Sequence, residues 1–344
     1  MQAEPVRLLL AAAVFLAAVP MHRAFRAAPR LRPLAPAVGR AEAACPVAST
    51  VPGHARARVH LALAATAVQA DSAPGKAGAT PLVYDGTLTQ RQADFSVEDR
   101  IKLARMLDDF GMNYIEAGWP TVFPADRVFF VRARDELDPT CFGKLVAMAP
   151  LLSAGESGGP TSTVESLLKT GAVNVGVAVN AASTHGSLDE TLGSTLKRLR
   201  AGRADGGVVA HLHNAMHAYR TDAATVTALI GVACKAGADI VLLVDTGGTA
   251  TPWEVEAMTR HLQAAVQWGD TRLGVDCREQ SELSVAATLY AARQGVGVLA
   301  GTVNGFGGSA DLAVVLPVLQ LKMATLLKRT PHGCGFILVN ILEH

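Results

Sequence analysis

The segment Ile240-Val241-Leu242-Leu243-Val244 is an uninterrupted apolar run, and Lys235-Ala236-Gly237-Ala238-Asp239 leads directly into it. The second segment is typical of the end of a helix, where glycine readily adopts the left-handed conformation that closes the last turn. The first is typical of a strand buried on both faces, because a strand with one face in water alternates apolar and polar residues. Together they predict a helix that leads into a parallel strand of an α/β fold.

The same unit of strand and helix recurs from residue 81 onward. One of the helical patterns opens with Ser96, which can cap the free amides of the first turn together with Asp99. The eight strand candidates cover residues 82–84, 113–116, 144–148, 173–179, 208–212, 240–244, 273–275 and 297–300. Eight strands, each followed by a helix, predict a closed (β/α)8 TIM barrel. An open doubly wound sheet is the alternative, since periodicity does not show closure.

The first 80 residues differ in composition from the rest of the chain. Residues 1–70 contain eight arginines, no lysine and two acidic residues, and an apolar run over 8–19 follows Arg7. A helix of that length spans about 18 Å, too short for a bilayer but suited to a secretory signal. The Arg-, Ala- and Pro-rich stretch that follows is typical of an organelle transit peptide. We predict a poorly ordered two-part leader over 1–80 for a plastid (chloroplast), a barrel over 81–330 and a short tail over 331–344.

The overall composition excludes several classes of protein. Hydrophobic residues make up 50% of the 344, so the chain can bury a large core and is not globally disordered. A formal net charge of +1 gives no basic field for nucleic acid, and we expect no membrane association once the leader is removed. The five cysteines contain no CxxC pair, which argues against a zinc ribbon or a disulfide scaffold.

The active site of a TIM barrel lies at the C-terminal ends of its strands. His211 and His213 are two residues apart at such an end, so their side chains would point the same way. With the nearby His217 they could hold a divalent ion. The alternative is that one histidine faces the mouth of the barrel and the others cap a loop. Asp245-Thr246 could likewise orient a substrate or cap the next helix.

Two glycine motifs have a functional and a purely structural interpretation. Residues 155–159 match the G-x-S-x-G pattern of hydrolases, but Pro160 follows where a helix should begin, so we predict a flexible loop. Gly305, Gly307 and Gly308 follow the last strand, where barrels often bind phosphate through backbone amides. A tight turn is the alternative at that position.

Four stretches of the chain occur in the order that a known family shows. They are Tyr84-Asp85-Gly86-Thr87-Leu88, Tyr114-Ile115-Glu116-Ala117-Gly118-Trp119-Pro120, Asp245-Thr246-Gly247-Gly248-Thr249 and Gly301-Thr302-Val303-Asn304-Gly305-Phe306-Gly307. The chain from about 81 to 323 thereby resembles the citramalate synthase family, with its 2-isopropylmalate and homocitrate synthases. The resemblance implies a barrel that condenses acetyl-CoA with a 2-oxo acid. It also implies a divalent metal (Mg, Mn or Zn) that polarises the oxo acid as a Lewis acid.

The chain departs from this family at the elements that hold the metal. The Leu-Arg-Asp-Gly run of the first strand reads Leu88-Thr89-Gln90-Arg91, and about four residues are missing before Phe95. The His-x-His-Asn-Asp run of the seventh strand reads Asp276-Cys277-Arg278-Glu279-Gln280, and the glycine loop after the eighth strand is shorter by about three residues. A guanidinium has no lone pair for a metal. We therefore predict no set of metal ligands.

Other groups of the family's site remain, and they are the candidate site residues. The candidate catalytic residues are Asp85, Glu116 and His213, and the candidate substrate-binding residues are Thr87, Asp245, Thr246, Asn304, Gly305 and Gly307. We predict a diverged family member that has lost the metal-dependent activity and needs no cofactor. Acetyl-CoA and a 2-oxo acid remain its candidate ligands.

Three alternatives to this prediction stay open. One is an active synthase with a rearranged metal site that uses Asp276 and the histidines near 213. Another is a non-catalytic partner that forms a heterodimer with an active homologue; the resemblance also leaves a homodimer open. A third is a gene-model error that shortens the loops. Because only residues 324–344 follow the resemblance, we expect no regulation by a bound amino acid.

Overall fold

The computed structural model describes residues 80–152, 159–183 and 188–323. The predicted tail, nearly all of the predicted leader and most of the G-x-S-x-G motif lie outside the described residues. In the part of the chain that is described, no helix is both long enough and apolar enough to cross a membrane.

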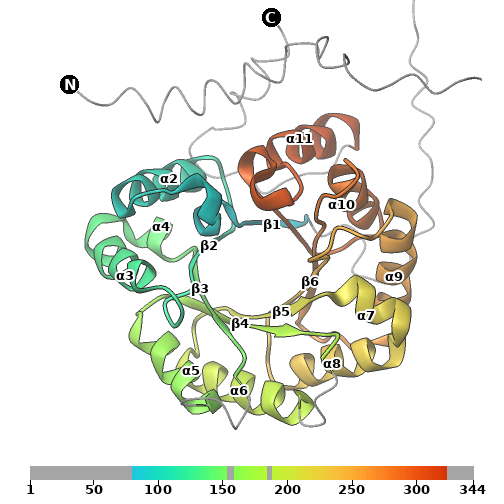
Figure 1. Cartoon of the computed structure of the whole chain (residues 1–344), viewed down its shortest axis with the longest axis horizontal. Helices are drawn as coiled ribbons and strands as arrows, with labels where there is room; N and C mark the ends of the chain where they lie inside the picture. The colour runs from blue at the N-terminus through green and yellow to red at the C-terminus, as the bar shows by residue number, and fades with distance from the viewer. Residues whose placement is uncertain (1–79, 153–158, 184–187, 324–344) are drawn as a thin grey trace, which may run out of the picture. The chain divides into compact units, whose positions relative to one another are not determined.

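The strands form one closed parallel barrel (Figure 1). They are β1 (Leu82–Asp85), β2 (Tyr114–Gly118), β3 (Leu145–Pro150), β4 (Asn174–Asn180), β5 (Val208–His213), β6 (Ile240–Val244), β7 (Arg272–Asp276) and β8 (Val298–Gly301). Each strand pairs with the next, and β1 pairs with β8 from Leu82 opposite Val298 to Asp85 opposite Gly301. The predicted (β/α)8 TIM barrel is confirmed, and the open sheet is excluded.

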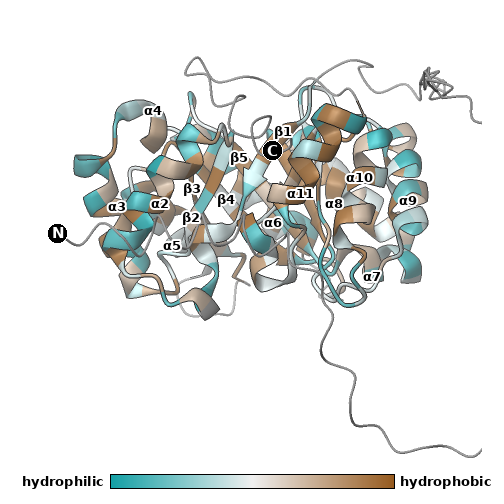
Figure 2. Cartoon of the chain, turned by 90° about the horizontal axis from the view of Figure 1, so that it is seen from above, coloured by the Kyte–Doolittle hydropathy of each residue, from teal (hydrophilic) through white to brown (hydrophobic). Residues whose placement is uncertain are grey.

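The helices surround the barrel, and Figure 2 shows both hydrophilic and hydrophobic residues along them. The α-helices are α2 (Val97–Asp109), α3 (Pro124–Glu136), α4 (Pro139–Phe142), α5 (Gly159–Lys169), α6 (Leu188–Gly202), α7 (Ala215–Thr221), α8 (Ala223–Lys235), α9 (Pro252–Ala265), α10 (Ser284–Arg293) and α11 (Leu312–Pro317). Short 3-10 segments are η1 (Thr87–Thr89), η2 (Arg91–Ala93) and η3 (Val303–Gly308), and η4 (Val318–Lys322) is a π-helix. The predicted cap of α2 is present, because Ser96 Oγ accepts from Asp99 N at 3.1 Å.

The interior of the barrel is packed with side chains from alternate strand positions. Every residue of β6 is buried, as its apolar run predicts. Ile240, Leu242 and Val244 belong to the cluster inside the barrel, which also contains Tyr84 and Met148. Because strand side chains alternate, Val241 and Leu243 face the surrounding helices. This filled interior leaves the mouth of the barrel as the place for a site.

Candidate active site

A cavity of about 230 Å³ lies at the C-terminal ends of the strands. Its walls combine charged, polar and apolar side chains from β1, β2, β5, β6, β7 and β8 and from segments that follow some of these strands. The lining residues are Tyr84, Gly86, Thr89, Gln90, Arg91, Glu116, Trp119, Phe123, His211, His213, Leu242, Asp276, Arg278, Ala300, Gly301 and Ser309.

Glu116 is the carboxylate that two neighbouring side chains hold in place. Its Oε2 accepts from the hydroxyl of Tyr84 at 3.1 Å, and its Oε1 accepts from Nε1 of Trp119 at 2.9 Å. Glu116 is 8% exposed, and this burial raises the pKa of its carboxyl above the usual value, although the two hydrogen bonds oppose the rise. Burial also raises the pKa of Tyr84, with the Glu116 charge as the next cause. The phenol therefore stays a hydrogen-bond donor at neutral pH.

His211 and His213 line the same cavity from β5. Burial lowers the pKa of each imidazole to about 4, so both are neutral at pH 7. Their ring centroids are 6.1 Å apart, and Nε2 of each ring is buried without a hydrogen-bond partner among the described residues. His213 Nδ1 lies 3.3 Å from Oγ1 of Thr246. His217 is exposed on α7 and does not line the cavity, so the structure brings together only two of the three histidines considered for a metal.

Asp276, the last residue of β7, forms an ion pair with Arg278 two residues later. Arg278 Nη2 donates to Asp276 Oδ2 at 3.0 Å, and Arg278 Nη1 donates to the carbonyl of Gly307 at 3.3 Å. The Asp276 charge raises the pKa of the guanidinium, so it carries its charge at any ordinary pH. Within the part of the chain that the structure describes, Nε of Arg278 and Oδ1 of Asp276 are buried without a hydrogen-bond partner. Each side chain of the pair therefore keeps one polar atom, Nε of Arg278 and Oδ1 of Asp276, that the ion pair does not use.

Gln90 meets the same glycine loop from the opposite wall. Its Nε2 donates to the carbonyl of Gly86 at 3.0 Å. Gly307 has a φ of +67°, and a Cβ built on it would overlap Oε1 of Gln90. Gln90, Arg278 and the loop over 303–308 are therefore neighbours. Gln90 and Arg278, which depart from the family pattern and lie far apart in the sequence, therefore both contact the glycine loop after β8.

The side chains of the mouth do not fit the divalent ion that the resemblance implies. In the described residues, no three His, Cys, Asp or Glu side chains of the cavity bring their ligand atoms within 4.8 Å of one another. Both oxygens of Glu116 already accept hydrogen bonds, and Asp276 is paired with a guanidinium. The described residues of the mouth therefore offer no pre-formed coordination shell.

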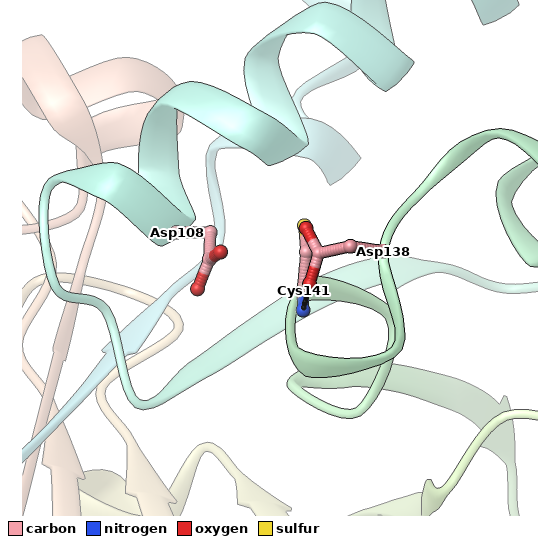
Figure 3. A group of neighbouring side chains, drawn as sticks. All are labelled: Asp108, Asp138 and Cys141. Carbon is pink, nitrogen blue, oxygen red and sulfur yellow. Dashed lines mark hydrogen bonds between the residues drawn. The ribbon is translucent and has the colours of Figure 1, made fainter.

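Among the described residues, one group of three such side chains does bring its ligand atoms within 4.8 Å of one another (Figure 3). It consists of Asp108 in the last turn of α2, Asp138 just before α4 and Cys141 in α4. Its members have structural roles. Asp108 pairs with Lys144, and Asp138 Oδ1 caps α4 by accepting from Thr140 N and Cys141 N at 2.9 and 3.1 Å. Burial raises the pKa of Cys141 to about 12, so the thiol stays protonated and is a poor metal ligand.

Asp85 and Thr87, two of the sequence candidates, bind each other instead of lining the cavity. Asp85 is fully buried and accepts from both N and Oγ1 of Thr87 at 2.9 Å. Thr87 Oγ1 in turn accepts from Val303 N at 2.9 Å. Burial raises the pKa of Asp85 to about 7, against the effect of these hydrogen bonds. The two residues thereby fasten the end of β1 to the segment after β8.

The remaining candidates are not among the residues that line the cavity. Asp245 is buried, and its Oδ2 accepts from Ala250 N at 2.9 Å. Asn304 is exposed, with a φ of +67°. Gly305, Gly307 and Gly308 all have positive φ, as tight turns require. Phosphate binding by this loop stays a prediction.

Tyr84, Trp119 and Ser309 line the cavity, although they are not among the site residues predicted from the sequence. Tyr84 follows two apolar residues in β1, so no alternation of residue type marks which side chains face inward. Trp119 is placed by its loop, where its backbone N donates to Asp126 Oδ2 at 2.6 Å. This contact joins residues seven apart and has no sequence signature.

Comparison with known proteins places this barrel in a family. The HMGL-like family matches residues 84–332. (R)-citramalate synthase of Streptomyces coelicolor is 32% identical over 254 residues, which are 70% of this chain and 47% of that protein. The probable 2-isopropylmalate synthase of Methanopyrus kandleri is 29% identical over 252 residues, 69% of this chain and 47% of that protein. The chain thus spans about half the length of the curated relatives it matches.

Solved structures agree on the fold. HMG-CoA lyase of Bacillus subtilis superposes with a TM-score of 0.60 at 18% identity, covering 77% of this chain and 94% of that one. An HMG-CoA lyase solved with coenzyme A and 3-methylmalate has a TM-score of 0.58 at 15% identity, covering 77% and 92%. The chain therefore belongs to the HMGL-like family of TIM barrels, with the citramalate and 2-isopropylmalate synthases as its relatives.

Proposed function

We propose that this chain is a citramalate synthase-like barrel that has lost the metal-dependent condensation of acetyl-CoA with a 2-oxo acid. The observation that carries the proposal is the ion pair between Arg278 and Asp276. In the family this strand end supplies two histidines to the metal. Here it supplies a fixed cation together with its own counter-ion.

The charge of Arg278 opposes a metal at the same spot. A unit charge and a divalent ion about 4 Å apart repel by roughly 8 kcal/mol at an effective dielectric constant of about 20. Asp276 keeps Oδ1 unpaired, but its negative charge is already balanced by the guanidinium at 3.0 Å, which would stay beside a metal bound there. Without a Lewis acid the carbonyl of a 2-oxo acid is not polarised for attack.

An assay of CoA release by the purified full chain tests the proposal. Acetyl-CoA and pyruvate are supplied with Mg²⁺, Mn²⁺ or Zn²⁺, and free CoA is followed with a thiol reagent. We expect no CoA release above a matched reaction with EDTA. The citramalate synthase of Streptomyces coelicolor serves as the positive control. Steady CoA release that requires both substrates would overturn the proposal.

An active synthase with a rearranged site is the second candidate. It is favoured by one observation, that Asp276, His211 and His213 line a single cavity. Metal analysis of the dialysed protein separates the two candidates, because a stoichiometric divalent ion supports the active enzyme. Sequencing the transcript tests whether the short loops are genuine.

A non-catalytic partner of an active homologue, located in a plastid, would also need no metal. This proposal rests on the family resemblance and on the composition of residues 1–80. Co-purification of the chain with a full-length synthase from isolated plastids would support it, and a strictly monomeric chain would count against it.

A further inference from the structure

The outer side of α11 and η4 is apolar. Residues 312–319 read Leu-Ala-Val-Val-Leu-Pro-Val-Leu, and their buried members are Leu312, Val315, Leu316 and Leu319. Val314 and Leu321 are 45% and 54% exposed, and Val318 between them is half-buried. Because they are spaced by four and three residues, these three side chains share one side of the helical segment and form an apolar stripe. A helix that is apolar all round is normally covered all round.

The outer side of α2 is polar by comparison. In Figure 1, α11 lies on the outside of the barrel between α10 and α2. The solvent side of α2 carries Glu98, Arg105 and Asp109, as expected for a helix that packs on a barrel through one face only. Single exposed apolar side chains are common on proteins and need no partner. Three on one side of the same short segment indicate a docking surface.

The chain supplies an apolar segment shortly after this stripe. Residues 336–342 read Phe-Ile-Leu-Val-Asn-Ile-Leu, and the 12 residues 324–335 connect them to Met323. A connection of that length can span up to about 40 Å. The helical segment from Leu312 to Lys322 is only about 16 Å long. Residues 336–342 are therefore within reach of every part of the apolar stripe.

The size of the stripe favours a tethered occupant over a separate molecule. A stable interface between two chains buries about 800 Å² on each partner and uses about 20–30 residues a side. The outer side of α11 and η4 offers only a few side chains. A segment of the same chain needs less contact area, because a short connection gives it an effective concentration in the millimolar range. The stripe therefore suits residues 336–342 better than a second copy.

We propose that residues 336–342 dock on the apolar stripe of the same chain. The docked segment also supports the mouth of the barrel. Asp311 Oδ1 accepts from Ala313 N in the first turn of α11 and from Asn304 N in the glycine loop, both at 2.9 Å. Anchoring α11 therefore steadies the loop that follows β8. This inference does not depend on whether the condensation activity is lost.

Hydrogen–deuterium exchange of the full chain, read by mass spectrometry, tests the proposal with Val314→Glu. Asp311 is the N-cap of α11, so a glutamate at 314 completes a capping box and favours the helix when its outer side is open to water. Under a docked segment the same carboxylate would be buried and would release the segment. We expect amides of residues 336–342 to exchange at least about tenfold faster in this variant. Val131→Glu on α3 is the matched control, because Val131 is 61% exposed, and it should leave that exchange unchanged.

Leu338→Glu is the reciprocal variant. Amides of residues 314–319 should exchange about tenfold faster in it, and the double variant with Val314→Glu should show no further change, because either substitution alone separates the two surfaces. Unchanged exchange of residues 336–342 in Val314→Glu would refute the proposal, and so would two effects that simply add. Protection that is lost on dilution from about 50 µM to about 0.5 µM would assign the stripe to a second copy and overturn it as well.

Discussion

Arg278 Nη2 donates to Oδ2 of Asp276, 3.0 Å away and only two residues earlier in the chain. Residues two apart in extended backbone project on the same side, and Cys277 between them is buried on the other. The end of β7 therefore carries its cation and counter-ion in one segment. If the proposed loss of the metal site holds, the behaviour of this site should follow from the protons and charges of the chain itself.

Asp85 should make the fold less stable as the pH rises. Its pKa is raised to about 7 by burial, so its contribution to stability is complete below about pH 4 and is lost as the pH rises through about 7. The full effect is on the order of 4 kcal/mol. We expect Asp85→Asn to gain stability relative to the parent chain between pH 5 and pH 8, measured by urea unfolding.

The difference between variant and parent isolates Asp85 from other groups that titrate in this range. Thr87→Val is the companion variant, because it removes the hydroxyl that donates to Asp85 and accepts from Val303. It should cost about 1–3 kcal/mol at pH 7. A difference between Asp85→Asn and the parent that does not change with pH would contradict the assigned pKa.

His211 should make the fold less stable as the pH falls, which is opposite to the effect of Asp85. Burial lowers its pKa to about 4, so the folded chain holds it neutral. Its contribution to stability is complete above about pH 6.5 and is lost as the pH falls through about 4, with a limit of about 3 kcal/mol. We expect His211→Gln, which cannot be protonated, to reduce the loss of stability between pH 7 and pH 4. His217→Gln on the exposed face of α7 is the control.

Loss of the Asp126 charge should lower the free energy of unfolding, because Asp126 holds two arginines beside the cavity. It accepts from Arg100 Nη1 at 2.8 Å and from Arg91 Nη1 at 3.1 Å, and Arg100 is 3% exposed. Removing one partner of a buried ion pair costs about 3–5 kcal/mol. We expect Asp126→Asn to lower the free energy of unfolding by about that amount. Asp135→Asn, exposed on the same helix, should change it by less than about 0.5 kcal/mol.

The fold could be predicted because its signals are local. The apolar run of β6 and the cap formed by Ser96 and Asp99 each depend on neighbouring residues, and both are present in the structure. The positions around the mouth were harder to predict. In β1 only the register decides that Tyr84 faces the cavity while Asp85 turns to Thr87, and the residues before them are uniformly apolar. Similarly, the meeting of Gln90 with Gly307 depends on closure of the barrel between β8 and β1.

Restoring the family's ligands should restore metal binding. A triple variant with Gln90→Asp, Asp276→His and Arg278→His returns the carboxylate and imidazoles of the family pattern and removes the guanidinium. We expect the dialysed variant to retain Zn²⁺ or Mn²⁺ near one equivalent, measured by mass spectrometry of the metals. The parent chain should retain much less than one equivalent, since its mouth has no set of ligand atoms within reach of one ion in the described residues.

Two controls identify the cause of any gain in metal binding. Gln90→Asp alone keeps Arg278 and should bind no better than the parent, because the guanidinium still repels the ion. Arg278→His with Asp276→His, without the change at Gln90, should bind more weakly than the triple variant because one anionic ligand is missing. If the triple variant holds no more metal than the parent, the shortened loops after β1 and β8 prevent coordination by themselves, and the charge of Arg278 is not the deciding term.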